Sequence, residues 1–534
     1  MSNESTEDST PKGKAGIVSI AIMCSRILGL VREIVLGGLF GGSRWMDSFM
    51  IAFRTPNMLR DLFAEGALST AFVTTFSKKI KGEGDESAWD LARKMITLVT
   101  VFMSGVTVVG VLLAPLIVKL MAWGWTDSPE QIQFTVILAR IIYGFIGLIS
   151  LAALVMGMLN SKGYFFVPAI ASSFFNLGSI ISGALIGYWI DPCWGRWSLV
   201  GFAIGVLVGG FCQLLVQLPS LRKVGFRFRP DFGWLDPAVK KVLSLMVPAI
   251  ISGSAVQVGV ALNTFFASFL DREGSVSFLQ WAFRLMQLPL GVFGVAVATV
   301  TLPAISRAAA EGVSDEFRNI LSRGVRLVFL MTIPSALGLA LLAEPIISVI
   351  FQRGRFTAED AIATAAALQM YAMGLIFYAG IKVVQPAFYA IDKKWIPMYV
   401  SFFTIATNAA LNYIWIFMLD KSHEYLALST AISSLLNFFL LYVMMRIFAG
   451  HFHTGKLIST VFRIMIAGTA LSAVALVSKY TILAQWATMA FAPKAMALGV
   501  TIALAAAAYF WVAKVLRIEE MDEFVAMVKR RTKR

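Results

Sequence analysis

Four arginines lie inside two apolar segments near the start of the chain: Arg26, Arg32, Arg54 and Arg60. Each segment is long enough to cross a lipid bilayer. An ionised side chain at bilayer depth costs at least about 2.5–3.5 kcal/mol on insertion scales, so it normally faces a polar cavity or a partner. A guanidinium group presents a planar fork of donors that matches phosphate and carboxylate groups. These residues therefore indicate recognition of an anion inside a membrane.

The other ionisable residues in apolar segments favour a positively charged cavity. Further cations are Arg140, Arg284 and Lys382, and the acids are Glu33, Asp47, Asp61, Glu65 and Glu344. We expect some pairing, such as Arg32 or Arg60 with Asp47. Alternatively, arginines hold helices together or extend to a membrane interface, which stays open for Arg54 and Arg140. The residues predicted to line a cavity are Arg26, Arg32, Arg60 and Arg284.

The composition is that of an all-α membrane protein. Of 534 residues, 58% are hydrophobic and 14% are charged, whereas soluble domains carry roughly 25% charged residues. Apolar runs of about 20 residues recur along the chain, unlike the roughly 10-residue alternation of a membrane β-barrel. We interpret the first run as an uncleaved span rather than a signal peptide. The net charge of +15 requires no nucleic acid, because cytoplasmic loops of membrane proteins collect Lys and Arg.

We predict about fourteen transmembrane helices. Their expected limits are residues 17–40, 45–76, 91–121, 132–160, 165–190, 199–221, 239–270, 276–305, 321–351, 358–391, 396–419, 425–448, 457–477 and 486–516. Alternate connections are rich in Lys and Arg, and the intervening ones are poor in them. The positive-inside rule then places both termini in the cytoplasm, which requires an even number of spans.

A repeat of about 230 residues indicates two lobes of six helices each. Residues 112–126 match 341–357, and residues 48–54 match 277–284 with one insertion. The offset of six spans gives both halves one orientation, which predicts a pseudo-twofold axis along the membrane normal and a substrate site near the midplane. The predicted divisions are an N-terminal lobe 1–221, a cytoplasmic linker 222–241, a C-terminal lobe 242–450, two extra helices within 451–516 and an amphipathic tail 517–534.

The sequence lacks the motifs of disulfide frameworks, metal sites, ATP-binding loops and common catalytic sites. The three cysteines are widely separated and predict no disulfide framework. The three histidines do not form a usual metal-ligand set. We find no Walker A sequence and no catalytic Ser/His/Asp or paired-carboxylate arrangement. The sequence therefore predicts a transporter that has no ATPase of its own and is not an enzyme.

Two stretches carry a family resemblance over nearly the whole chain. The first is Arg26-Ile-Leu-Gly-Leu-Val-Arg32-Glu33 with Asp47, Phe53-Arg54-Thr-Pro56-Asn-Met-Leu-Arg60 and Glu65-Gly66-Ala67. The second is Asn263–Leu270, Gly274-Ser-Val-Ser277 and Arg284-Leu-Met-Gln287-Leu-Pro289. Together they resemble the MurJ (MviN) lipid II flippases of the multidrug/oligosaccharidyl-lipid/polysaccharide exporter superfamily.

The resemblance implies an activity and a set of site residues. Members move lipid-linked peptidoglycan precursor from the inner to the outer leaflet of the bacterial cytoplasmic membrane for cell-wall synthesis and cell shape. The implied cavity residues are Arg26, Arg32, Asp47, Arg60, Ser277, Arg284 and Lys382. The headgroup of lipid II would bind this basic cavity, and its polyprenyl tail would lie in lipid or in a hydrophobic groove beside the last two helices. Membrane lipids and cell-wall synthesis proteins are the other implied partners.

The sequence departs from the family pattern around the second lobe's arginine. Members often carry acids at the positions of Phe283 and Gln287, so this cavity is expected to be more positive. The sodium site described in the family takes acids from spans seven and eleven. Here those spans offer Gln257, and Asn408 with Asn412, as weak candidates. We predict no cofactor, and leave coupling to the membrane potential or to a monovalent cation open.

Other functions remain as alternatives to a lipid II flippase. One is a flippase for a different anionic lipid-linked oligosaccharide, and another is a non-transporting membrane scaffold of cell-wall assembly. A cation exporter of the same superfamily should line its cavity with acids, which argues against it. A membrane glycosyltransferase would need acidic groups at a water-facing active site, and none cluster in this sequence.

Overall fold

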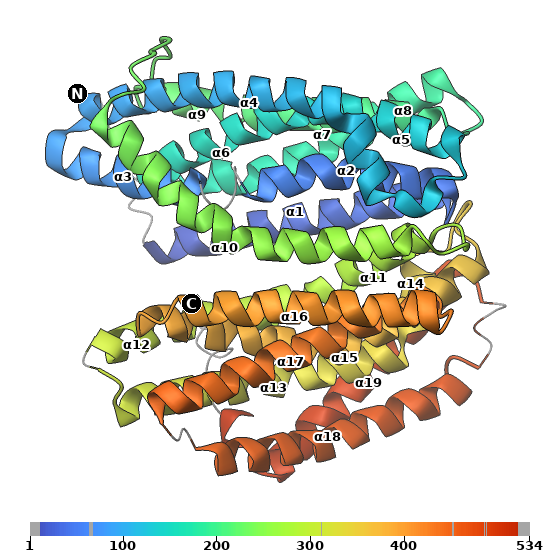
Figure 1. The fold of residues 1–534 in the computed structure, drawn as a ribbon. Helices are drawn as coiled ribbons and strands as arrows, with labels where there is room; N and C mark the ends of the chain where they lie inside the picture. Colours follow the sequence, from blue (N-terminus) through green and yellow to red (C-terminus); the bar gives the residue numbers. More distant parts are fainter. Residues whose placement is uncertain are drawn as a thin grey trace, which may run out of the picture. The chain divides into compact units, whose positions relative to one another are not determined.

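The computed structural model describes residues 11–62, 68–310, 312–450, 453–484, 486 and 489–521. Every regular element in these ranges is helical, which confirms the predicted all-α class. The chain divides into two compact units, Met1–Phe269 and Leu270–Arg534. They are the blue-to-green helices α1–α10 and the light-green-to-red helices α11–α19 of Figure 1. Glu65 and the end of the predicted tail lie outside the described residues.

Ten α-helices build the first unit (Figure 1). They are α1 (Pro11–Phe40), α2 (Arg44–Arg60), α3 (Ser69–Glu83), α4 (Asp85–Met121), α5 (Pro129–Tyr143), α6 (Phe145–Ser161), α7 (Phe166–Ile190), α8 (Ser198–Leu215), α9 (Leu218–Lys223) and α10 (Pro237–Ala267). The short 3-10 helix η2 (Trp123–Trp125) follows α4. Helix α1 packs against α7, and α2 packs against α5.

Glycines bring α7 and α8 into close backbone contact. On α8, Gly201, Gly205 and Gly209 recur every four residues and so share one face. A Cβ at Gly201 would overlap the backbone of Gly187 on α7, and a Cβ at Gly205 would lie 2.7 Å from the Ser179 carbonyl oxygen. Small residues at such spacing are typical of helix pairs in membranes, where close packing replaces the hydrophobic effect as the source of attraction. Helix α1 packs against α7, one member of this pair.

The second unit is arranged around α15 (Ala358–Ala390), which packs against α11, α13 and α17. Its other elements are α11 (Ser275–Pro289), η3 (Leu290–Gly294), α12 (Val295–Ala310), α13 (Asp315–Leu341), α14 (Ala343–Phe351), α16 (Trp395–Tyr413), η4 (Ile414–Met418), α17 (Glu424–Ala449), α18 (Thr454–Tyr480) and α19 (Phe491–Val515). Here η3 and η4 are short π-helical turns that continue the helices before them. Helix α18 packs against α13 and α19.

Eleven helical stretches in the described residues are long and apolar enough to span a membrane. They coincide with eleven of the fourteen spans predicted from the sequence, so the exact number of fourteen stays a prediction. The three remaining predicted spans are those at α1, at α2 with α3, and at α10. The first two carry the arginines and acids singled out above, and residues 63–67 of the second lie outside the described residues. In α10, where several side chains between residues 248 and 256 also lie outside the described part of the chain, residues 257–267 form a shorter apolar helix.

Helix α10 belongs to the first compact unit in this structure. It packs against α3 and α4, and the unit extends to Phe269. At its end, the Ser268 hydroxyl accepts a hydrogen bond from the Gly124 backbone N–H at 3.0 Å. From the sequence, this span is expected to belong to the C-terminal lobe that starts at residue 242. Which helices move together during transport remains a prediction.

Helix α19 completes the hydrogen bonding of α13. Pro334 lies inside α13 and has no N–H, so the carbonyl of Leu330, four residues earlier, loses its helical donor. The buried Tyr509 hydroxyl of α19 donates to that carbonyl oxygen at 2.6 Å. An unsatisfied carbonyl in an apolar region is costly, which explains why a tyrosine from the last helix lies against this turn of α13.

An ion pair fastens the segment after α19 to the same face of α13. Arg326, one turn before Leu330, donates from Nε to Glu520, and its Nη1 donates to the Ser322 hydroxyl at 2.9 Å. Arg326 is 8% exposed and Glu520 only 2%. Ile518 is buried in the core of the second unit. The first residues of the predicted amphipathic tail, Arg517–Met521, thus carry two side chains that are buried in the protein.

Candidate functional site

Two arginines of α1 lie in different environments. Arg26 and Arg32 are six residues apart, which places them about 240° apart around a helix. Arg26 is exposed, whereas Arg32 is buried on the side of α1 that packs against α7. Of the two, Arg26 therefore has the side chain that a ligand can reach in this structure.

Arg32 lies between three helices of the first unit. Its Nη2 is 3.0 Å from Oε1 of Glu33, and the two side chains form a buried ion pair. Its guanidinium carbon lies 5.3 Å from the ring centroid of Phe53 on α2 and 5.6 Å from that of Phe175 on α7. A cation close to aromatic rings is attracted by their quadrupole, most strongly where water is excluded. Arg32 thus contributes to the packing of α1, α2 and α7.

Arg60 forms an ion pair at the C-terminal end of α2. Its Nε and Nη2 donate to Oδ1 of Asp61 at 3.2 and 2.8 Å, and both side chains are partly exposed. Gln257 of α10 donates from Nε2 to the other oxygen, Oδ2, at 3.4 Å. A cation in the last turn of a helix also interacts favourably with the helix dipole. Arg60 is therefore held in place yet remains partly accessible.

The predicted pairing with Asp47 is wrong for Arg60. Both residues lie on α2, thirteen positions apart, so they are separated by about 20 Å along the helix axis. Arg32 uses Glu33, its neighbour in the chain. Asp47 is buried in the first turn of α2, where a carboxylate is favoured by the helix dipole.

In the second unit, α11 carries two of the predicted site residues. Ser277 is buried and Arg284 is half-buried, and the two are separated by seven residues, or about two turns. Beside Arg284, the ring of Phe283 packs edge-to-face on Tyr371 of α15 at 5.3 Å. Lys382 is exposed, further along α15. The structure thus places Arg284 and Lys382 on two packed helices, α11 and α15.

The weak sodium candidates belong to a polar row between α16 and α17. Thr404, Asn408 and Asn412 recur every four residues on α16 and are buried. Asn412 donates from Nδ2 to Oδ1 of Asn408 at 3.2 Å, and Asn437 of α17 donates to the Thr404 hydroxyl at 3.1 Å. Among the described residues, no group of three or more His, Cys, Asp or Glu side chains could hold a metal ion. Cation coupling remains a prediction.

The structure gives Arg326 a role that no sequence pattern assigned to it. This residue lies in the predicted span 321–351, and it is eleven residues inside α13, whose N-cap is Ser314. The signal available was the helix start: Ser314 followed by Asp315 and Glu316 is a typical N-terminal capping pattern. Its partner Glu520 could not be found from the sequence, because 194 residues separate the two.

Comparisons with known proteins give a consistent result. Residues 36–497 match the family model described as lipid II flippase MurJ. A probable lipid II flippase MurJ of Vibrio cholerae is 34% identical over 95% of this chain and 97% of its own length. The lipid II flippase MurJ of Burkholderia cenocepacia is 34% identical over 80% of this chain and 82% of its own.

Solved structures agree in the fold. The inward closed conformation of a lipid II flippase MurJ matches with a TM-score of 0.75 and 25% identity, covering 93% of this chain and 98% of that one. An inward-facing multidrug resistance transporter of the MATE family matches with a TM-score of 0.66 at 15% identity, over 82% of this chain and 98% of its own, which supports the fold alone. The extent of these matches shows that this multi-pass membrane protein belongs to the lipid II flippase MurJ family.

Proposed function

We propose that this protein is a lipid II flippase, a transporter that moves the lipid-linked peptidoglycan precursor across the bacterial cytoplasmic membrane for cell-wall synthesis. The observation that carries the proposal is the 34% identity to a probable lipid II flippase over 95% of the chain. The transport mode is alternating access, and both termini are cytoplasmic. Lipid II is the substrate, and proteins of cell-wall synthesis are further candidate partners.

The proposed site residues are Arg26, Arg32, Asp47, Arg60, Ser277, Arg284 and Lys382. Three observations support a role for the arginines. Arg26 is exposed, Arg60 is partly accessible, and Arg284 is half-buried. A pyrophosphate diester carries charge that guanidinium groups bind through paired hydrogen bonds. Arg32 supports the site by holding α1 against α2 and α7.

Binding of the pyrophosphate would replace interactions that the arginines now make within the chain. Arg60 is the clearest example of such a replacement. Its partner Asp61 is the next residue in the chain, so the two stay close whether or not the ion pair forms. Replacing Asp61 by a phosphate oxygen costs less free energy than leaving the Arg60 guanidinium without a counter-charge, because the positive charge stays compensated throughout. The energy source is proposed to be the membrane potential, with a monovalent cation at Asn408 and Asn412 as the alternative.

Complementation of a bacterium depleted of its own flippase tests this function. The wild-type chain is expressed beside Arg26→Ala, Arg60→Ala and Arg284→Ala at matched membrane levels, with Lys78→Ala, an exposed cation on α3, as the control. We expect growth with wild type and the control, and at least a tenfold loss of viable cells with each arginine variant. Growth with all variants would favour a scaffold that does not transport. Absence of growth even with wild type would contradict the lipid II assignment.

A further inference from the structure

Residues 222–241, which comprise the end of α9, the connection to α10 and the start of α10, expose both cations and large apolar side chains. Its exposed cations are Arg222, Lys223, Arg227, Arg229, Lys240 and Lys241. Between them lie Phe228, Phe232 and Leu235, which are 54%, 66% and 81% exposed. Exposing large apolar side chains to water is unfavourable. Aromatic and basic side chains next to one another are typical of segments that lie in a lipid headgroup layer.

The segment is fixed to the first unit where it leaves α9. Gly225, with a φ of +93°, ends α9, and the Phe226 N–H bonds back to the Leu221 carbonyl at 3.3 Å. The Phe226 ring is buried and lies 5.5 Å from the ring of Trp89 on α4. The turn and the buried ring therefore fix where the segment leaves α9.

Further contacts hold the second half of the segment on α4. The Asp231 N–H donates to the Thr97 hydroxyl at 3.1 Å, and Nζ of Lys94 lies 2.7 Å from Oδ2 of Asp236. Gly233 leaves room for Lys94, because a Cβ there would lie 2.9 Å from the Lys94 Cε. The hydrogen bond from Lys94 lowers the pKa of Asp236, so this carboxylate stays charged and paired. Six exposed cations of the segment are left to face its surroundings.

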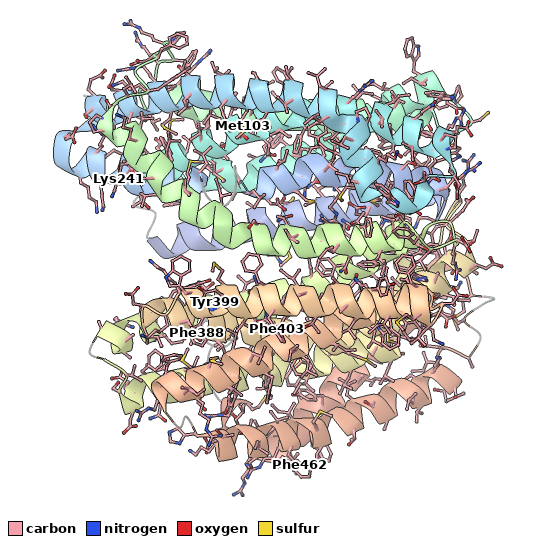
Figure 2. All side chains as sticks on the ribbon, in the orientation of Figure 1. Met103, Lys241, Phe388, Tyr399, Phe403 and Phe462 are labelled. Atoms are coloured by element: carbon pink, nitrogen blue, oxygen red, sulfur yellow. The ribbon has the colours of Figure 1, made fainter. Side chains whose placement is uncertain are left out.

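The position of the segment fits a membrane surface. It begins at the end of Ser198–Lys223, one of the candidate spans, and ends in α10, which starts at Pro237 and carries Lys240 and Lys241 before it turns apolar. In Figure 1 the loop leaves the first unit sideways, across the helix axes, at the end where α4 and α10 begin. Figure 2 labels Lys241 at this end of α10. A loop that extends sideways from the end of a span lies where the headgroups of the neighbouring lipids are.

We infer that residues 222–241 form an anchor that binds the headgroup layer of anionic phospholipids, with the cations on the phosphates and Phe228, Phe232 and Leu235 inserted below them. Anionic lipid is favoured over zwitterionic lipid because each Lys or Arg near a negatively charged surface adds to the attraction, which falls off within a Debye length. The anchor would fix the first turn of α10 relative to the bilayer. This inference does not depend on what the protein transports.

The test measures how deeply Phe232 enters the bilayer. A bimane fluorophore is attached to Phe232→Cys in full-length protein whose Cys24, Cys193 and Cys212 are replaced by serine. The protein is reconstituted in nanodiscs of phosphatidylglycerol or phosphatidylcholine with brominated acyl chains, which quench a fluorophore only by contact. We expect quenching at least twofold greater in phosphatidylglycerol, and reduced to the phosphatidylcholine level by 0.5 M salt, about a 4 Å Debye length.

A pair of matched variants tests whether the cations of the segment cause the difference. Arg227→Gln with Arg229→Gln is expected to abolish the preference for phosphatidylglycerol, whereas Lys78→Gln with Lys81→Gln, which removes two exposed cations of α3, leaves it unchanged. Equal quenching in both lipids would overturn the selectivity for anionic headgroups. No quenching in either lipid would overturn the anchor and leave the segment free for an acidic protein partner.

Discussion

The arginines discussed above differ between the two units in how far along the chain their acidic partners lie. In the first unit, Arg32 pairs with Glu33 and Arg60 with Asp61, each with its immediate neighbour, whereas a partly buried long-range pair of that unit belongs to a lysine, Lys94 with Asp236. In the second unit, Arg326 pairs with Glu520, 194 residues later. A pair between neighbours forms wherever the local helix forms, so it fixes no tertiary contact. A pair across 194 residues exists only in the folded unit.

We propose that this difference separates arginines that bind the ligand from one that holds the fold. In this proposal, Arg60 exchanges Asp61, its neighbour in the chain, for an anionic group of the ligand. Arg326 has no such freedom, because its partner is 2% exposed and removal of that partner would leave a buried cation uncompensated. Arg32 is intermediate, since its acid is local but the rings around it come from two other helices.

The largest expected effect comes from breaking the long-range pair. Glu520→Ala leaves the guanidinium of Arg326 buried without its acid, which costs about 3–5 kcal/mol. We expect a fall in Tm of roughly 10 °C for the purified protein in detergent, measured by thermal unfolding. Glu519→Ala, which removes an adjacent exposed acid, should leave Tm unchanged. Equal Tm values for both variants would show that the pair does not stabilise the second unit.

A smaller effect is expected from the second contact between α19 and α13. Tyr509→Phe removes only the hydroxyl and leaves the Leu330 carbonyl without a donor, at a cost of about 1–3 kcal/mol. Tm should fall by less than in Glu520→Ala. Tyr480→Phe, at an exposed tyrosine of α18, is the control and should have no effect. If Tyr509→Phe also leaves Tm unchanged, the Leu330 carbonyl must obtain a hydrogen bond from another donor.

The buried His423 makes a contact between distant residues whose contribution to stability depends on pH. Its Nε2 lies 2.9 Å from the Ala363 carbonyl oxygen of α15, its Nδ1 lies 3.5 Å from a Glu424 oxygen, and burial lowers its pKa. Above the ordinary histidine pKa of about 6.5 the neutral ring is present in both folded and unfolded protein. Below it the unfolded chain binds the proton more readily, so stability is lost as the pH falls.

Thermal unfolding at several pH values measures this contribution. Between pH 8 and pH 5, we expect Tm to fall less in His423→Gln than in wild type, because the glutamine does not titrate in this range. His453→Gln, at an exposed histidine of the same unit, serves as the control. Identical pH profiles for wild type and His423→Gln would contradict the assignment.

The smallest effect on stability is expected at Arg26. Arg26→Ala removes an exposed side chain, so the free energy of unfolding should change by no more than about 0.5 kcal/mol. Complementation should nevertheless be lost, as proposed above. A stable protein without function would sharpen the contrast with Glu520→Ala. A large fall in Tm for Arg26→Ala would instead show that this arginine holds the fold.

The sequence alone determined the all-helical class, eleven of the expected spans and the arginine-rich region of the first unit. These features are local, because each depends on a run of apolar residues or on charges within one run. The same locality explains the pairing of Arg60, since its acid is the next residue. The family was also recognisable, because its motifs are continuous stretches of sequence.

The tertiary structure decided what depends on residues distant in the chain. It placed α10 in the first unit, buried Arg326 with Glu520, and set Tyr509 against the carbonyl that Pro334 leaves without a donor. No periodicity or composition reports such partners, because the free energy of a buried charge or carbonyl depends on which groups the fold brings to it. The sequence therefore supplied the charges, and the packing of the helices determined which of them are buried in the fold and which remain accessible.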